Sequence, residues 1–156
     1  MIKIPNEVKN SQKYIFAIKV VETLRKKSHD TFFVGGAVRD MLLGLVSKEF
    51  DINTSATPDE IKDLFPVTKL VGQKFGVTLI VEGNMFIEVA TFREESNYSD
   101  KRRPDTVLYT SDVTNDIKRR DFTINGLLYD PLTGSVIDHC DGLKDIQDKV
   151  LRTIGE

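Results

Sequence analysis

The spacing of apolar residues predicts helices in several parts of the chain. Residues 8–27 form a predicted amphipathic helix, because apolar side chains recur there at helical spacing: Val8, Ile15, Ile18, Val21 and Leu24. Helical composition and cap residues predict four further stretches: residues 37–44 with Gly44 as C-cap, a helix from Thr57 with Pro58 in its first turn, most of residues 112–129, and residues 141–150.

Short apolar or alternating runs predict strands between these helices, over residues 31–34, 49–53, 76–82, 85–92 and 135–138. Gly83 and Asn84 separate two of the runs, which favours a hairpin. Residues 95–106 are polar and contain a proline, so we expect a loop there. Strands and helices do not alternate strictly. We therefore expect an α+β domain with a mixed or antiparallel sheet of about five strands, flanked by helices.

The composition narrows the functional classes. A length of 156 residues suits one domain, and a net charge of −2 argues against binding nucleic acid by bulk electrostatics alone. Two basic clusters, residues 101–103 and 118–120, could still bind phosphates or simply be solvated. One cysteine, no signal peptide and no apolar run of about 18 residues predict a cytoplasmic protein without a membrane anchor.

Glu49 and Asp51 are two carboxylates spaced to lie on one face of a strand, because strand side chains alternate. Mg²⁺ favours a few carboxylate oxygens, with waters and substrate phosphates completing its coordination. Glu88 is a lone charge in an otherwise apolar strand, which is costly unless the carboxylate is paired or binds a metal. The alternatives are a solvent-facing strand edge for the first two residues and a buried Glu–Arg pair for Glu88.

Two further motifs have the composition of a nucleotide site. Gly35 and Gly36 end a predicted strand and precede a helix that carries Arg39, so a phosphate could approach the backbone closely and bind the guanidinium. Asp40 could orient that arginine. The segment DIKRRDFTIN, residues 116–125, could reach a nucleotide through Arg120 and Asp121. A plain glycine turn and a charged helix start, capped by Asp121 or Thr123, are the alternatives.

Five segments together resemble the class II CCA-adding enzymes and bacterial poly(A) polymerases, which are polymerase β-like nucleotidyltransferases. In chain order they are GGAVRDMLLG, EFDINTSATP, EVATFR, YSDKRRPDTV and DIKRRDFTINGLLYDP. The resemblance extends from about residue 31 to the end of the chain. It implies a small head domain whose five-stranded sheet carries the active site.

The resemblance also implies roles for individual residues. Glu49 and Asp51 take the positions of the paired acids that hold Mg²⁺, and Glu88 that of a third acid that helps to activate the terminal hydroxyl of the RNA. The stretch SNYSDKRRP matches a loop that influences which nucleotide is added. The residues implied to bind the nucleotide are Gly35, Gly36, Arg39, Asp116, Arg120, Asp121 and Asn125.

Two departures from the family pattern affect the interpretation. The first is that the family usually has aspartate where this chain has Glu49. Either the geometry of the metal site is adjusted to the longer side chain, or the catalytic activity is impaired. The second is that the sequence stops where the helical neck of the family begins. We expect an N-terminal helix in residues 1–30, a catalytic head in residues 31–147 and the start of the neck in residues 148–156, with the neck, body and tail domains absent.

The expected activity is transfer of C or A from CTP or ATP to the 3′ end of tRNA, with two Mg²⁺ ions. Poly(A) addition to other RNAs is an alternative within the same class. A catalytically impaired nucleotide-binding module is the alternative from another class. The oligomeric state and the choice among CCA, CC and A addition stay open.

Overall fold

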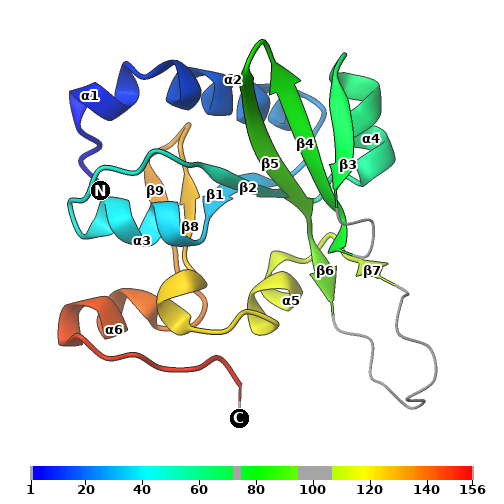
Figure 1. Ribbon diagram of the computed structural model, residues 1–156. Helices are drawn as coiled ribbons and strands as arrows, with labels where there is room; N and C mark the ends of the chain where they lie inside the picture. The colour runs from blue at the N-terminus through cyan, green and yellow to red at the C-terminus, as the bar shows by residue number, and fades with distance from the viewer. Residues whose placement is uncertain (1, 72–74, 95–106, 156) are drawn as a thin grey trace.

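The computed structural model describes residues 2–71, 75–94 and 107–155 (Figure 1). Seven strands form the main sheet in the order β3-β4-β5-β2-β1-β8-β9, and β6 pairs with β7 in a separate ribbon. The strands of the main sheet are β1 (Thr31–Val34), β2 (Asp51–Thr54), β3 (Thr68–Val71), β4 (Val77–Glu82), β5 (Met85–Thr91), β8 (Leu128–Asp130) and β9 (Ser135–Ile137). The ribbon consists of β6 (Arg93–Glu94) and β7 (Leu108–Tyr109).

Short helices flank the sheet, as the sequence predicts. They are α1 (Asn6–Lys9), α2 (Gln12–Lys26), α3 (Gly36–Leu42), α4 (Pro58–Leu64), α5 (Val113–Lys118), the 3₁₀ turn η2 (Thr123–Asn125) and α6 (Gly142–Asp148). The helix predicted over residues 8–27 is interrupted before Gln12, because the Ser11 hydroxyl accepts the backbone N–H of Tyr14 and starts α2 anew. Thr57 caps α4 as predicted, in a reciprocal arrangement with Glu60.

The sheet is mixed, since β2 and β5 run parallel and the other neighbours in it run antiparallel. The predicted hairpin between β4 and β5 is confirmed. Parallel pairing of β2 with β5 aligns Ile52 with Val89, and antiparallel pairing of β1 with β2 aligns Val34 with Asp51. The end of β1, the start of β2 and the middle of β5 are therefore close together.

One predicted helix is wrong, and two strands of the sheet were not predicted. Residues 112–129 are not mostly helical: α5 ends at Lys118, and Leu128–Asp130 forms β8, which pairs with β1 in the sheet. Burial of these apolar residues in the sheet outweighs their helix propensity. Strand β3 has mostly exposed residues and lacks the alternation that would have predicted it. With these two strands the sheet has seven members rather than about five.

Apolar side chains pack on both faces of the sheet. On one face, α2, α3 and α4 pack against Phe33, Ile52 and Val89 in the larger core cluster. On the other face, Ile117 of α5 packs with Phe32 in a smaller cluster. The smaller cluster, together with a hydrogen bond from Asn53 to Asp116, holds α5 against the face of β2 that carries Asp51. Within the described part of the chain, no helix has the length and apolar character needed to cross a bilayer.

Candidate functional site

The three predicted acidic residues line one hollow of about 260 Å³, together with Phe50, Phe86 and Ile87. Asp51 is the first residue of β2, and Glu88 directly precedes the β5 residue that pairs with Ile52. Phe50 and Ile52 are buried on the opposite face, which is the alternation expected of a strand. Glu49 itself precedes the strand, because β2 begins at Asp51 rather than at residue 49.

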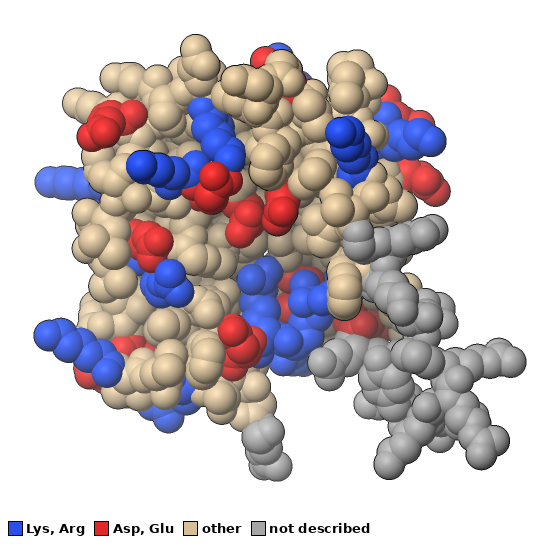
Figure 2. Space-filling view, in the orientation of Figure 1, with Lys and Arg blue, Asp and Glu red and all other residues tan. Residues whose placement is uncertain are grey.

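The pKa of Asp51 reflects both its burial and the neighbouring carboxylates of this hollow. Burial, then the neighbouring carboxylates of Glu88 and Glu49, raise the pKa of Asp51 above its ordinary value, against the opposing effects of Arg120 and Lys13. Figure 2 shows acidic side chains gathered near the centre of one face, with basic side chains below them. An added cation would relieve the repulsion among these carboxylates.

The donor set of Asp51, Glu88 and Glu49 fits Mg²⁺, since all three offer hard carboxylate oxygens. They do not form a closed cage: in residues 2–71, 75–94 and 107–155, no three or more His, Cys, Asp or Glu side chains are arranged to hold a metal ion. An open arrangement suits an ion that takes most of its ligands from water and substrate phosphates.

Glu88 differs from its sequence-based description. The sequence analysis treats it as a lone charge inside an apolar strand, but its side chain is exposed, as is that of Phe86 two residues earlier. The apolar residues of β5 that are buried lie on the other face. Glu88 therefore bears no burial cost, and the alternative of a buried Glu–Arg pair is wrong.

The glycine turn lies directly beside Asp51. Gly35 has φ +70° and ψ −144°, a conformation that glycine adopts and other residues avoid. A Cβ atom at this position would lie 4.0 Å from Asp51 Oδ2. The missing side chain therefore leaves space between the start of α3 and the carboxylates. Gly36 follows as the first residue of α3.

Arg39 connects this turn to the other predicted motif. Its Nε and Nη2 donate to Asp40 Oδ1 at 3.1 and 3.0 Å, which is the orientation predicted for Asp40. Its Nη1 donates to Asn125 Oδ1 at 3.1 Å. Asn125 in turn donates through Nδ2 to Asp121 Oδ1 at 3.2 Å. The four residues form one polar chain along the edge of the site.

Asp121 is held in its ionised form by its local hydrogen bonds. The side chain of Asn125 and the backbone N–H of Phe122 both donate to Asp121 and lower its pKa. The alternative in which Thr123 acts as a helix cap is wrong, because its hydroxyl donates to Asp145 Oδ2 at 2.6 Å. That buried bond fixes η2, and with it Asn125, against α6.

Asp116, predicted to bind the nucleotide, is fully buried and points into the protein. Its carboxylate accepts hydrogen bonds from Asn53 Nδ2 at 2.7 Å and from the Arg93 backbone N–H at 3.1 Å. It also pairs with Arg119 at 2.7 Å and Arg120 at 3.3 Å. A side chain without solvent exposure orients the arginines rather than contacting a ligand directly.

Sequence reasoning missed the contacts of Arg119, Asn53 and Lys13. The three- and four-residue spacing from Asp116 to Arg119 and Arg120 is the helical spacing of ion pairs and could have identified the first. Nothing in the local sequence links Asn53 to Asp116, or Lys13 to its ion-pair partner Glu49. The predicted loop and the basic cluster at residues 101–103 lie outside the described residues.

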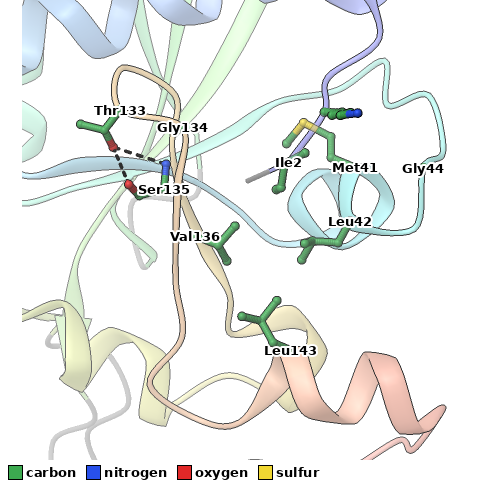
Figure 3. Close-up of a pocket in the computed structure, with 10 residues that line it drawn as sticks. Ile2, Met41, Leu42, Gly44, Thr133, Gly134, Ser135, Val136 and Leu143 are labelled. Carbon is green, nitrogen blue, oxygen red and sulfur yellow. Dashed lines mark hydrogen bonds between the residues drawn. The ribbon is translucent and has the colours of Figure 1, made fainter.

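A larger hollow of about 760 Å³ lies elsewhere, between the N-terminal segment, α3, the β8–β9 turn and α6. Figure 3 shows Ile2, Met41, Val136 and Leu143 around it. At its rim the Thr133 hydroxyl donates to Ser135 Oγ at 3.0 Å. Among the described residues that line it, none is acidic. Its larger size alone does not make it a catalytic centre. The smaller hollow has the carboxylates that could bind a metal ion.

The chain is similar in sequence and in fold to known proteins. A family model described as "Poly A polymerase head domain" matches residues 31–152. The CCA-adding enzyme of Bacillus pumilus (strain SAFR-032) is 41% identical over 146 residues, covering 94% of this chain and 36% of that protein. The crystal structure of the Bacillus stearothermophilus CCA-adding enzyme in complex with CTP has a TM-score of 0.81 and 35% identity, over 94% of this chain and 34% of that one.

A tRNA nucleotidyltransferase complexed with a primer tRNA and an incoming ATP analog matches with a TM-score of 0.65 and 28% identity, over 87% of this chain and 39% of that one. The chain thus spans about a third of the length of the relatives it matches. The predicted α+β fold and the predicted resemblance are both confirmed. The chain belongs to the family of poly A polymerase head domains.

Proposed function

We propose that this domain performs metal-dependent nucleotidyl transfer, adding C or A from CTP or ATP to the 3′ end of tRNA. The observation that supports it best is that Asp51 lines one hollow with Glu49 and Glu88. Arg120 is also near enough to lower the pKa of Asp51. Carboxylates that can hold a metal ion therefore lie near an arginine that can bind phosphate, as reactions of nucleoside triphosphates require. The relatives and structures named for CCA addition, CTP and primer tRNA support the same activity.

Asp51 and Glu49, with Glu88 beside them, are the residues proposed to hold Mg²⁺, as two ions in the active state. Bound Mg²⁺ supplies neutralisation of the triphosphate charge and lowers the pKa of the attacking hydroxyl. Glu88 is exposed and next to Asp51, so its carboxylate is placed to accept a hydrogen bond from the 3′-hydroxyl of the RNA.

The basic side of the site is proposed to bind the triphosphate. Arg39 presents a guanidinium fixed by Asp40 and Asn125, and Arg120 is fixed by Asp116. Arginines held in advance bind phosphate oxygens with little further ordering cost. A Cβ atom at Gly36 would lie 3.4 Å from Arg39 Nη2, so the glycine avoids crowding this guanidinium. Asp121 and Asn125 are proposed to contact the ribose.

The domain limits and the compartment follow from this proposal. We assign the catalytic unit to residues 31–147, preceded by the helical segment 1–30 and followed from residue 148 by the start of a neck. A tRNA substrate would place the protein in the cytoplasm.

Poly(A) addition is the second candidate, favoured by the description of the family model that matches. The experiment that separates the two compares labelled CTP and ATP incorporation into a tRNA lacking its CCA end and into an unrelated RNA. CCA addition predicts a short, tRNA-dependent product that contains C. Long products containing only A on either RNA would support the poly(A) alternative.

Asp51→Ala tests whether the carboxylates are catalytic, with Asp63→Ala as a control at an exposed position of α4. The first change should abolish incorporation and the second should leave it intact. Mg²⁺-dependent triphosphate binding without any incorporation, restored to transfer by Glu49→Asp, would instead show a catalytically impaired nucleotide-binding module. Wild-type incorporation by Asp51→Ala would refute the proposed metal-binding role.

A further inference from the structure

Lys13 lies in the first turn of α2, ahead of the residues that the family model matches. Its ammonium group forms an ion pair with Glu49 Oε2 and lies 5.0 Å from the centroid of the Phe86 ring. The lysine side chain is only 23% exposed, whereas that of Glu49 is 71% exposed. The lysine is therefore the more firmly held partner, and the glutamate is the more accessible one.

The stability of α2 does not explain this lysine. A cation in the first turn opposes the helix dipole, and the favourable basic residues of α2, Arg25 and Lys26, lie in its last turn. Ser11 already caps the helix start. The contacts of Lys13 are with Glu49 and Phe86, which both line the carboxylate hollow. Its position is thus better explained by that hollow than by the helix.

We propose that Lys13 is a built-in counter-ion that competes with divalent cations for Glu49. This inference rests on the proposed function, because it concerns the same metal site. A carboxylate paired with an ammonium group offers less negative charge to a second cation, and the ammonium repels that cation directly. A divalent ion that arrives alone therefore binds weakly.

The effect of the Lys13 charge on binding of the divalent ion changes from unfavourable to favourable when the ion arrives bound to a nucleotide. A divalent ion bound to CTP forms a complex with net negative charge, which Lys13 attracts rather than repels. Lys13 thus selects the metal–nucleotide complex over the free ion. In this role it is a positioning residue for Glu49.

Lys19 offers a matched control on the same helix. It pairs with Glu82 of β4 at 2.9 Å, but its side chain is 64% exposed, and Glu82 is not among the residues that line the carboxylate hollow. Lys13→Met keeps a side chain of similar length but removes the ammonium group, and with it the contacts to Glu49 and the Phe86 ring. Lys13→Arg keeps the charge.

The test is a titration of the purified protein with Mn²⁺, followed by electron paramagnetic resonance, first alone and then with CTP. Lys13→Met should bind free Mn²⁺ roughly three- to tenfold more tightly than wild type, as expected for removal of one nearby cation in a solvated site. It should bind the Mn²⁺–CTP complex no more tightly, or less. Lys13→Arg and Lys19→Met should both retain wild-type affinity for free Mn²⁺.

Two results would overturn the inference in different ways. If Lys13→Met lowers the thermal stability but leaves the affinity for free Mn²⁺ unchanged, Lys13 only anchors α2, and the metal site itself still stands. If the wild-type protein binds no Mn²⁺ with or without CTP, the proposed function fails together with the inference.

Discussion

Arg39 and Asn125 lie 86 positions apart in the sequence and are joined by a hydrogen bond of 3.1 Å. The bond connects the glycine turn after β1 to the turn η2 after α5. Because Asn125 is also bonded to Asp121, and its carbonyl accepts from Arg120 at 3.3 Å, two separate sequence motifs become one polar surface. The guanidinium of Arg39 is thereby oriented before any ligand arrives.

Asn125→Ala should weaken CTP binding in the presence of Mg²⁺ by roughly tenfold, the value of one hydrogen bond to a charged group. The reason is that Arg39 loses its partner in η2 and must be ordered by the ligand. Isothermal titration calorimetry measures the change, with Asn10→Ala at the exposed junction of α1 and α2 as control. Equal affinities for Asn125→Ala and wild type would show that this bond does not orient Arg39 for binding.

Asp116→Asn should lower the free energy of unfolding by about 3–5 kcal/mol, the usual cost of breaking a buried charged network. The neutral amide cannot balance Arg119 and Arg120 while it also accepts from the Arg93 backbone N–H. Urea denaturation gives the value. Asp63→Asn, on the exposed side of α4, should change it by less than about 0.5 kcal/mol. A similarly small effect at Asp116 would argue against the buried network.

Asp51→Asn should raise the melting temperature at neutral pH in buffer without divalent ions. The pKa of Asp51 is raised above 3.8 in the folded protein, so the folded state binds this proton more tightly than the unfolded state. The ionised carboxylate then destabilises the fold above that raised pKa, and the penalty disappears as pH falls below the unfolded value.

The advantage of Asp51→Asn over wild type should therefore shrink as the solution is acidified. Differential scanning calorimetry of both proteins from neutral to acidic pH measures this difference in melting temperature. A variant that melts below wild type at neutral pH would contradict the raised pKa of Asp51 and the destabilisation attributed to its ionised form.

Gly35→Ala should cost roughly 1–3 kcal/mol of stability, because its backbone conformation is strained for any residue with a side chain. It should also weaken nucleotide binding, since the added methyl group would face Asp51. Gly83→Ala is the matched control: Gly83 also has a positive φ, +62°, but a Cβ there meets no atom within 4 Å. Gly83→Ala should lose about 1–2 kcal/mol with unchanged CTP affinity. Equal CTP affinity in both variants would contradict the role assigned to Gly35.

The sequence predicted those elements whose local signals agree with the fold. The hairpin of β4 and β5 and the cap at Thr57 are confirmed, because turn and cap chemistry act over a few residues. Residues 119–129 were mispredicted as helical, since only tertiary pairing with β1 makes Leu128–Asp130 a strand. Strand β3 lies at the sheet edge, with little buried surface to impose a pattern.

The candidate site was also predicted only in part. Alternation correctly placed Phe50 and Ile52 on the face opposite Asp51. Whether Asp116 points inward and whether Glu88 is exposed depend on which helix covers which face of the sheet, and the periodicity of one segment carries no such information. The pair of Lys13 with Glu49 joins segments that are distant in sequence and has no local signal.

The most direct test of the proposed site is anomalous diffraction from crystals soaked with Mn²⁺ and CTP. The account predicts a manganese peak at the carboxylate of Asp51, shared with Glu49 or Glu88, and triphosphate density between it and the guanidinium groups of Arg39 and Arg120. Manganese bound elsewhere, or CTP bound without contact to these residues, would contradict it.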